Sequence, residues 1–318
     1  MKLVLKLLGV LAGLLVLVMI VAWFKYRGPD IPYETLDVKY ADEHSHFVDL
    51  PQGIRLHYKD EGKPDGPLLI LLHGYGDSFT SWEGWVEALK DRYRLISLDF
   101  PGHGLTRAPA SYRLDGDSLA DLVEAFAARA DLPRFALAGN SMGGGVAWRY
   151  AVRHPDRLQA LILVDAAGFP PEAPPKDVPL AFKILRYEWG RKLLASIDNT
   201  PLIDQGLKAD VYDKSLITPA LVARWAEFQR APGHRDILMG ISPLKQLVAT
   251  TEVVARIRAP TLVMHGAADV LIELSSSRRM AAAIPGAKLI VYPNVGHLPQ
   301  IEIPQRSAAD VAGFLGGI

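Results

Sequence analysis

The chain has 318 residues, no cysteine, and 35 basic against 35 acidic side chains. The absence of cysteine excludes disulfides, thiolate metal sites and thiol nucleophiles, and a net charge of zero argues against a nucleic-acid partner. The length suits one large domain or two small ones, with enough residues to bury a substantial core.

The first 27 residues are predicted to form a membrane anchor. The stretch Leu7–Phe24 has 18 residues without a charge, and as a helix it would be roughly 27 Å long, close to the ~30 Å hydrocarbon core of a bilayer. Lys2 and Lys6 precede this stretch, and Lys25 and Arg27 follow it. A cleaved signal peptide is the alternative, although its apolar region is usually shorter. We therefore expect a single-pass N-terminal anchor, with the rest of the chain outside the cytoplasm.

Residues 28–45 are predicted to be a polar connector, because Gly28-Pro29 and Ile31-Pro32 interrupt regular structure. After it, Phe47–Leu50 and Ile54–Lys59 flank a Pro-Gln-Gly turn. This arrangement predicts a β-hairpin.

Beyond the hairpin, short apolar runs alternate with segments of helical spacing. The predicted strands are Pro67–Leu72, Tyr93–Leu98, Phe135–Ala138, Leu158–Val164, Pro260–Met264 and Lys288–Tyr292. The predicted helices are Ser118–Ala130, Gly143–Arg153, Ser275–Ala283 and a last helix from about Pro304. Continuous apolar strands that alternate with helices predict an α/β fold, with a mostly parallel, doubly wound sheet.

The alternation stops between Phe169 and Lys245. This stretch has bulky apolar residues at helical spacing and no clear strand pattern. It predicts a helical insertion at residues 169–245 that divides the core into residues 46–168 and 246–318.

Gly139-Asn140-Ser141-Met142-Gly143 is a G-x-S-x-G motif between a predicted strand and a predicted helix. In that context the serine lies on a sharp turn, where small neighbours are needed and its hydroxyl is exposed as a nucleophile. The alternative is a glycine-rich turn whose serine caps the helix. The strand–helix context favours Ser141 as the nucleophile.

A serine hydroxyl needs a base, and the base needs an acid that orients it. His297 follows the last predicted strand, and Asp269 follows the strand before it. The order Ser141, Asp269, His297 is the order that this class of motif requires. Asp165, at the end of Leu158–Val164, is the rival acid. Three further histidines are interpreted as loop-organising residues: His73, His103 and His265.

From about residue 46 to its end, the chain resembles α/β-hydrolases. Five motifs in order carry the resemblance: Leu71–Gly76, Asp99–Gly104, Gly139–Gly144, Gly266–Asp269 and Gly296–His297. The chain is similar to the branch that contains cap-bearing esterases, lipases, monoacylglycerol lipases and meta-cleavage C–C hydrolases. The resemblance implies that the helical insertion is a cap domain. It also implies an oxyanion hole formed by the backbone N–H groups of Tyr75 and Met142.

The expected function is a serine hydrolase that cleaves carboxylic esters through an acyl-enzyme, with no cofactor and no metal. The apolar insertion and the predicted anchor favour lipophilic esters, such as monoacylglycerols or medium-chain acyl esters. Insertion side chains that could line the acyl pocket are Phe182, Trp189, Trp225 and Met239.

Two other functions are open. Meta-cleavage C–C hydrolases share the Gly-Asn-Ser-Met-Gly-Gly run, but they typically carry Trp after the catalytic histidine, where this chain has Leu298. A membrane-tethered binding protein without activity is the other alternative. The presence of all three candidate catalytic side chains argues against it. The sequence does not indicate an oligomeric state.

Overall fold

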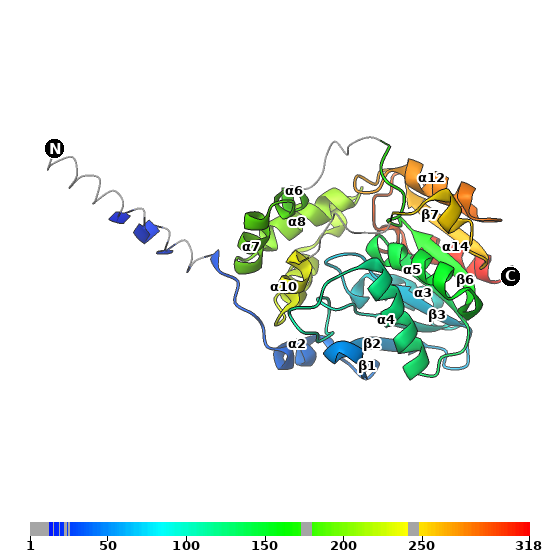
Figure 1. Ribbon diagram of the computed structural model, residues 1–318, viewed down its shortest axis with the longest axis horizontal. Helices are drawn as coiled ribbons and strands as arrows, with labels where there is room; N and C mark the ends of the chain where they lie inside the picture. Colours follow the sequence, from blue (N-terminus) through cyan, green and yellow to red (C-terminus); the bar gives the residue numbers. More distant parts are fainter. Residues whose placement is uncertain are drawn as a thin grey trace.

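The protein is described from a computed structural model, which covers residues 13, 14, 16–18, 20, 21, 24, 26–172, 180–240 and 248–318. For residues 181 and 182 only the backbone is described. A central sheet carries helices on both sides, and a group of helices coloured green to yellow lies beside one end of it (Figure 1).

Eight strands form one sheet in the order β1-β2-β4-β3-β5-β6-β7-β8. Strand β2 pairs antiparallel with β1 and β4, and all the other neighbours are parallel. The strands are β1 (Ser45–Leu50), β2 (Ile54–Gly62), β3 (Leu68–Leu72), β4 (Arg94–Leu98), β5 (Phe135–Asn140), β6 (Leu158–Val164), β7 (Thr261–Gly266) and β8 (Lys288–Tyr292). The predicted mostly parallel α/β sheet is confirmed, and the carboxyl ends of β3 to β8 meet at one edge.

Both faces of this sheet are buried, which explains why its strands are continuous apolar runs. In β3, Leu68, Ile70 and Leu72 belong to the core cluster on one face, while Leu69 and Leu71 belong to the cluster on the other. The first face is covered by α4 (Gly116–Arg129), α5 (Met142–Arg153), α11 (Thr251–Val254) and α12 (Leu274–Ala283). The second is covered by α3 (Glu83–Leu89) and α14 (Pro304–Leu315), with the short α13 (Pro299–Glu302) before it.

Between β6 and β7 the described chain is helical, as the sequence predicted for this stretch. Before α11, the helices are α6 (Leu180–Leu185), α7 (Glu188–Ser196), α8 (Thr200–Asp210), α9 (Pro219–Gln229) and α10 (His234–Met239). They have a small core of their own, in which Leu207, Val222 and Trp225 pack together with Leu298 from the β8–α13 loop. We call α6–α10 the helical insertion.

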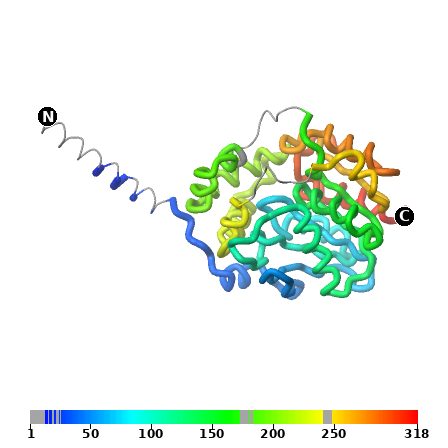
Figure 2. Tube along the Cα trace, in the orientation of Figure 1, coloured from blue at the N-terminus to red at the C-terminus, as the bar shows by residue number. Residues whose placement is uncertain are grey.

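The segment predicted to be a polar connector is instead packed against the body of the protein. It contains α2 (Tyr33–Tyr40), whose Leu36 is fully buried against Phe79, Leu105 and Phe228. The hydroxyl of Tyr40 donates to a carboxylate oxygen of Glu227 on α9 at 2.8 Å. Along the trace, the blue segment passes the helical insertion before it reaches α2 (Figure 2). The prediction missed α2 because only one side of this short helix carries a core residue.

The structure contradicts the predicted membrane location. Among the described residues, no helix combines the length and the apolar character needed to cross a bilayer. A spanning helix needs about 20 consecutive apolar residues. Because the described residues contain no such helix, the predicted single-pass anchor, with the catalytic body outside the cytoplasm, is corrected. Much of Leu7–Phe24 lies outside the described residues.

Replacing Leu36 tests whether α2 is part of the folded core. We expect Leu36→Ala to lower the free energy of unfolding by about 2–5 kcal/mol, because a fully buried leucine leaves a cavity. Chemical denaturation of the full chain measures this loss. The matched control is Val38→Ala on the same helix, where the side chain is 89% exposed and the expected change is within about 0.5 kcal/mol. Equal effects of the two substitutions would show that α2 does not contribute to the core.

Candidate active site

Ser141 stands between the end of β5 and the start of α5, at the carboxyl edge of the sheet. Its backbone dihedrals are φ 53° and ψ −116°, in a region that side chains other than glycine rarely adopt. Strain of this kind persists only where the surrounding structure enforces it, and it is common at functional sites. The backbone N–H of Ser141 donates to Val164 O at 3.0 Å, and its carbonyl accepts from Gly145 and Ala167.

The glycines around Ser141 are required by close packing. A Cβ atom on Gly139 would lie 2.3 Å from Gly143 O, and one on Gly143 would lie 2.2 Å from Leu72 O. The start of α5 therefore packs directly against the end of β3. On the other side, a Cβ on Gly74 would lie 3.3 Å from Ser141 Cβ, so the β3 loop passes beside the serine.

His297 and Asp269 form a pair at the same edge. His297 Nδ1 lies 2.7 Å from Asp269 Oδ2, and both side chains are buried. The other carboxylate oxygen of Asp269 accepts from the backbone N–H groups of Leu271 and Ile272 at 2.7 and 3.0 Å. Because both oxygens are occupied, the carboxylate is held in one orientation toward the imidazole.

The pKa of each member of the pair moves in the direction that favours the charged form. Burial would raise the pKa of Asp269, but the charge and the hydrogen bond of His297 hold it below its usual value. Burial would lower the pKa of His297, but the Asp269 carboxylate, with added negative charge from Asp210 and Asp77, raises it. The site therefore stabilises a positive charge on the imidazole.

Ser141 and His297 come from segments that lie next to each other. Asn140, the last residue of β5, donates from Nδ2 to His297 O at 3.0 Å and to Val164 O at 3.2 Å. The Asn140 side chain, next to Ser141 in the sequence, thus fixes the backbone of His297.

Asp165, the rival acid, lies behind this pair. Its Oδ1 accepts from Gly266 N at 2.9 Å and is 3.3 Å from His265 Nδ1. Burial and the nearby charge of Asp269 raise the pKa of Asp165 well above its usual value. Among the described carboxyl groups, Asp269 and not Asp165 accepts the hydrogen bond from the His297 ring.

Asp165, His265 and Asp269 also form a group whose possible metal-ligating atoms lie within 4.8 Å of one another. Asp269 already bonds to His297, and His265 Nδ1 is 2.8 Å from Ser277 Oγ. A metal ion there would compete with the hydrogen bond that orients the imidazole.

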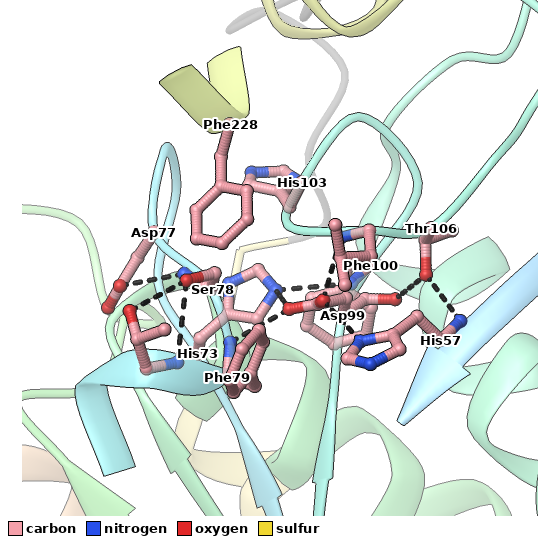
Figure 3. A network of polar contacts seen from close by, with 12 residues as sticks. His57, His73, Asp77, Ser78, Phe79, Asp99, Phe100, His103, Thr106 and Phe228 are labelled. Carbon is pink, nitrogen blue, oxygen red and sulfur yellow. Dashed lines mark hydrogen bonds and ion pairs between the residues drawn. The ribbon is translucent and has the colours of Figure 1, made fainter. Parts of the chain in front are cut away.

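The loop after β3, which carries Tyr75, is supported by a buried polar network around Asp99 (Figure 3). Asp99 accepts from the N–H of Phe79 at 2.8 Å and from the N–H of Leu105 at 2.9 Å, and its Oδ2 lies 2.7 Å from His57 Nδ1. His73 donates from Nδ1 to Gly74 O and accepts at Nε2 from Phe100 N, as a neutral imidazole does. His73 thus fixes loop geometry, as the sequence indicated.

A cavity of about 100 Å³ lies between this loop and the helical insertion. Its lining is mostly apolar and includes Tyr75, Leu207, Trp225 and Met239. Of the other two insertion residues predicted to line a pocket, Trp189 is 62% exposed and stacks on Tyr187, and the side chain of Phe182 lies outside the described residues.

Two carboxyl groups near His297 were not singled out in the sequence. Asp210 ends α8 and lines the cavity, and burial raises its pKa to about 7. Asp77 lies in the loop after β3, and burial raises its pKa to about 7 as well. No sequence pattern marks either residue, because each comes close to His297 only through the fold.

Titration of the histidines tests the electrostatics of the site. We expect the His297 imidazole, followed by NMR, to titrate above 6.5, and Asp269→Asn to lower that midpoint because the neighbouring charge is lost. The buried His73 is the internal control, since burial lowers its pKa and it should remain neutral where His297 is charged. A His297 midpoint that does not respond to Asp269→Asn would refute the coupling.

Comparison with known proteins agrees with this geometry. A family model described as alpha/beta hydrolase fold matches residues 67–208. The chain is 30% identical over 246 residues to a pimeloyl-[acyl-carrier protein] methyl ester esterase of Nitrosomonas europaea, with 76% of this chain and 93% of the relative covered. It is 29% identical to a 2-hydroxymuconate semialdehyde hydrolase of a Pseudomonas species, with 84% and 92% covered.

Among solved structures, the chain is similar to one described as a membrane phospholipase A and bacterial virulence factor. The TM-score is 0.71 at 26% identity, and the match covers 99% of this chain and 96% of that one. The relatives are thus hydrolases that act on different substrates. Since more than nine tenths of an esterase that is 30% identical aligns with it, the chain belongs to the α/β-hydrolase family.

Proposed function

We propose that the protein is a serine hydrolase in which Ser141 is the nucleophile, His297 the general base and Asp269 the acid that orients it. The buried 2.7 Å pair between His297 and Asp269, at the same sheet edge as the strained turn of Ser141, is the observation that carries the proposal. His297 accepts the hydroxyl proton as Ser141 attacks a carbonyl carbon, and it later donates that proton to the leaving group. Water then hydrolyses the acyl-enzyme.

The proposed oxyanion hole consists of the backbone N–H groups of Tyr75 and Met142. The close approach of Gly74 to Ser141, and of Gly143 to the end of β3, supports this assignment, because it brings both backbone segments to the serine. Two such donors stabilise the negative charge that develops on the carbonyl oxygen, and losing one typically costs ~10²–10³ in turnover.

We assign residues 169–245 as a cap domain over the core of residues 46–168 and 246–318. The support is the cavity that separates the helical insertion from the loop after β3. Its mostly apolar lining, with Trp225 and Met239, favours lipophilic carboxylic esters, such as monoacylglycerols or medium-chain acyl esters. The phospholipase and the methyl ester esterase among the similar proteins are named for ester substrates.

Hydrolysis of a C–C bond, as in the meta-cleavage hydrolases, is the second candidate, since such enzymes are also similar to this chain. Several relatives are named for substrates that are carboxylate anions, such as 2-hydroxy-6-oxo-2,4-heptadienoate. Among the described residues that line the cavity, Asp210 is the charged side chain, and there is no lysine or arginine. A cavity lining with a carboxyl group and no lysine or arginine disfavours an anionic substrate, so we favour the neutral ester.

Replacement of the three proposed catalytic residues tests the mechanism. We expect Ser141→Ala, His297→Ala and Asp269→Asn each to lower kcat for a p-nitrophenyl ester by at least about 10³-fold, with little further loss when they are combined, because the three act as a unit. Asp165→Asn is the matched control and should have a mild effect. The reverse order of the two aspartates would move the acid to Asp165.

The same assay gives a pH profile and a labelling test. Because only the neutral imidazole accepts a proton, kcat/KM should fall as the pH drops through the raised pKa of His297, above 6.5. A fluorophosphonate probe should label the parent protein and not Ser141→Ala. Failure of the folded parent to react would point to a binding protein without activity.

A series of p-nitrophenyl esters tests the lipophilic substrate class. Each buried methylene adds up to ~0.8 kcal/mol, so kcat/KM should rise by as much as roughly two decades from four to eight acyl carbons, then level off. Trp225→Ala and Met239→Ala should shift the preferred length while acetate esters are hydrolysed as before. A flat profile, together with cleavage of a 2-hydroxy-6-oxodienoate, would favour the C–C hydrolase.

A further inference from the structure

Asp210 lies at the catalytic end of the cavity. One face of α8 lines this cavity with five residues: Leu202, Ile203, Gly206, Leu207 and Asp210. Asp210 is also the last residue of the helix. Asn199, which precedes the helix, also lines the cavity, at the opposite end of α8 about 16 Å away. The wall supplied by α8 is therefore apolar along its length and ends in a carboxyl group.

The backbone fixes the position of Asp210 relative to the imidazole. The N–H of His297 donates to Asp210 O at 2.6 Å. A Cβ on Gly296 would lie 2.3 Å from the same oxygen, so the two segments are in close contact. The end of α8 therefore cannot withdraw from His297 without breaking this hydrogen bond.

The carboxyl group of Asp210 has an unused acceptor. Its Oδ1 is buried and has no hydrogen-bond partner among the described residues. Burial raises the pKa of Asp210, and the charge of His297 opposes that rise. A buried acceptor without a donor is unfavourable, and because Asp210 lines the cavity, a molecule bound there, a ligand or water, can supply the donor.

The chemistry of ester hydrolysis indicates which part of the substrate would supply that donor. The leaving alcohol takes its proton from His297, so the alcohol oxygen must lie beside the imidazole. Of the residues that line the cavity, Asp210 is the one whose backbone is bonded to His297. The alcohol part of an ester would thus lie within reach of the Asp210 carboxyl group.

We propose that Asp210 is a specificity-determining residue that accepts a hydrogen bond from a free hydroxyl group on the alcohol part of the ester. The inference rests on the proposed serine hydrolase function and narrows its substrate class. Partial esters of a polyol, such as monoacylglycerols, are then preferred over esters of the same acid with a simple alcohol.

A second polar side chain of the cavity lining, Gln229, fits a polyol better than a cation. Gln229 on α9 lines the cavity, and its Nε2 is 3.5 Å from Gly76 O, in the loop that follows Tyr75. A carboxamide both donates and accepts, as a hydroxyl group does. An ammonium group would bond with Asp210 but could not accept from the Gln229 amide.

The test compares two substrates with the same acyl chain, monooctanoylglycerol and methyl octanoate. We expect the parent protein to favour the glycerol ester. Asp210→Leu should lower kcat/KM for that ester by about 10- to 100-fold, the size expected for a hydrogen bond to a charged group. Loss of the Asp210 charge beside His297 acts on both esters alike, so the ratio of kcat/KM for the glycerol ester to kcat/KM for methyl octanoate should itself fall by about 10- to 100-fold. Asp210→Asn keeps an acceptor and should show an intermediate loss.

Asp204→Leu is the matched control, since it removes a carboxyl group from the same helix, where Asp204 pairs with Lys208 at 2.8 Å. It should leave the ratio of the two substrates unchanged. Comparing substrates within each variant cancels any effect on folding or on the pKa of His297, because both act on the two esters alike.

Equal losses on the two esters in Asp210→Leu would overturn the inference, and so would a parent that hydrolyses both but does not favour the glycerol ester. A loss that is larger for octanoylcholine than for monooctanoylglycerol would assign the subsite to an ammonium group instead. In each of these cases the parent still cleaves esters, and the serine hydrolase mechanism stands. A parent that cleaves none of the esters would overturn the proposed function together with the inference.

Discussion

The lack of space at the turn between β5 and α5 is the constraint on which the site depends. Gly139 and Gly143 touch across the turn, and the start of α5 rests on the carbonyl of Leu72 in the neighbouring strand. This packing holds Ser141 at positive φ, and it also fixes where the loop after β3 runs. The strain at one residue is supported by two fully buried strands of the sheet, β3 and β5, so the turn and the loop keep their relative positions.

Three carboxyl groups surround the His297 imidazole and favour its positive charge. His297 bonds to Asp269, while the carboxyl groups of Asp210 and Asp77 add weaker negative charge from the helical insertion and from the loop after β3. Burial raises the pKa of both weaker groups to about 7, so they need not be fully ionised near neutral pH. The Asp269 carboxylate therefore orients the imidazole, while the ionisation of Asp210 and Asp77 depends on their burial and on the charges around them.

The helical insertion is joined to the core at the site itself. The N–H of His297 donates to Asp210 O, and Leu298 packs in the core of the insertion beside Leu207 and Trp225. On the opposite side, α2 connects to α9 through the Tyr40–Glu227 hydrogen bond. A shift of the insertion would therefore also move the backbone of His297 and with it the imidazole. This contact links substrate recognition to the proposed base.

The sequence by itself determined the sheet, its alternation with helices, and the candidates Ser141, Asp269 and His297. These features are written in local patterns: buried parallel strands are continuous apolar runs, and the residue after each strand end falls at one edge of the sheet. Only the tertiary structure decided that Asp269 and not Asp165 contacts His297, that α2 packs into the core, and that Asp210 reaches the site. Those contacts join segments far apart in the chain, and their partners are selected by packing and burial, which leave no periodic signal in the sequence.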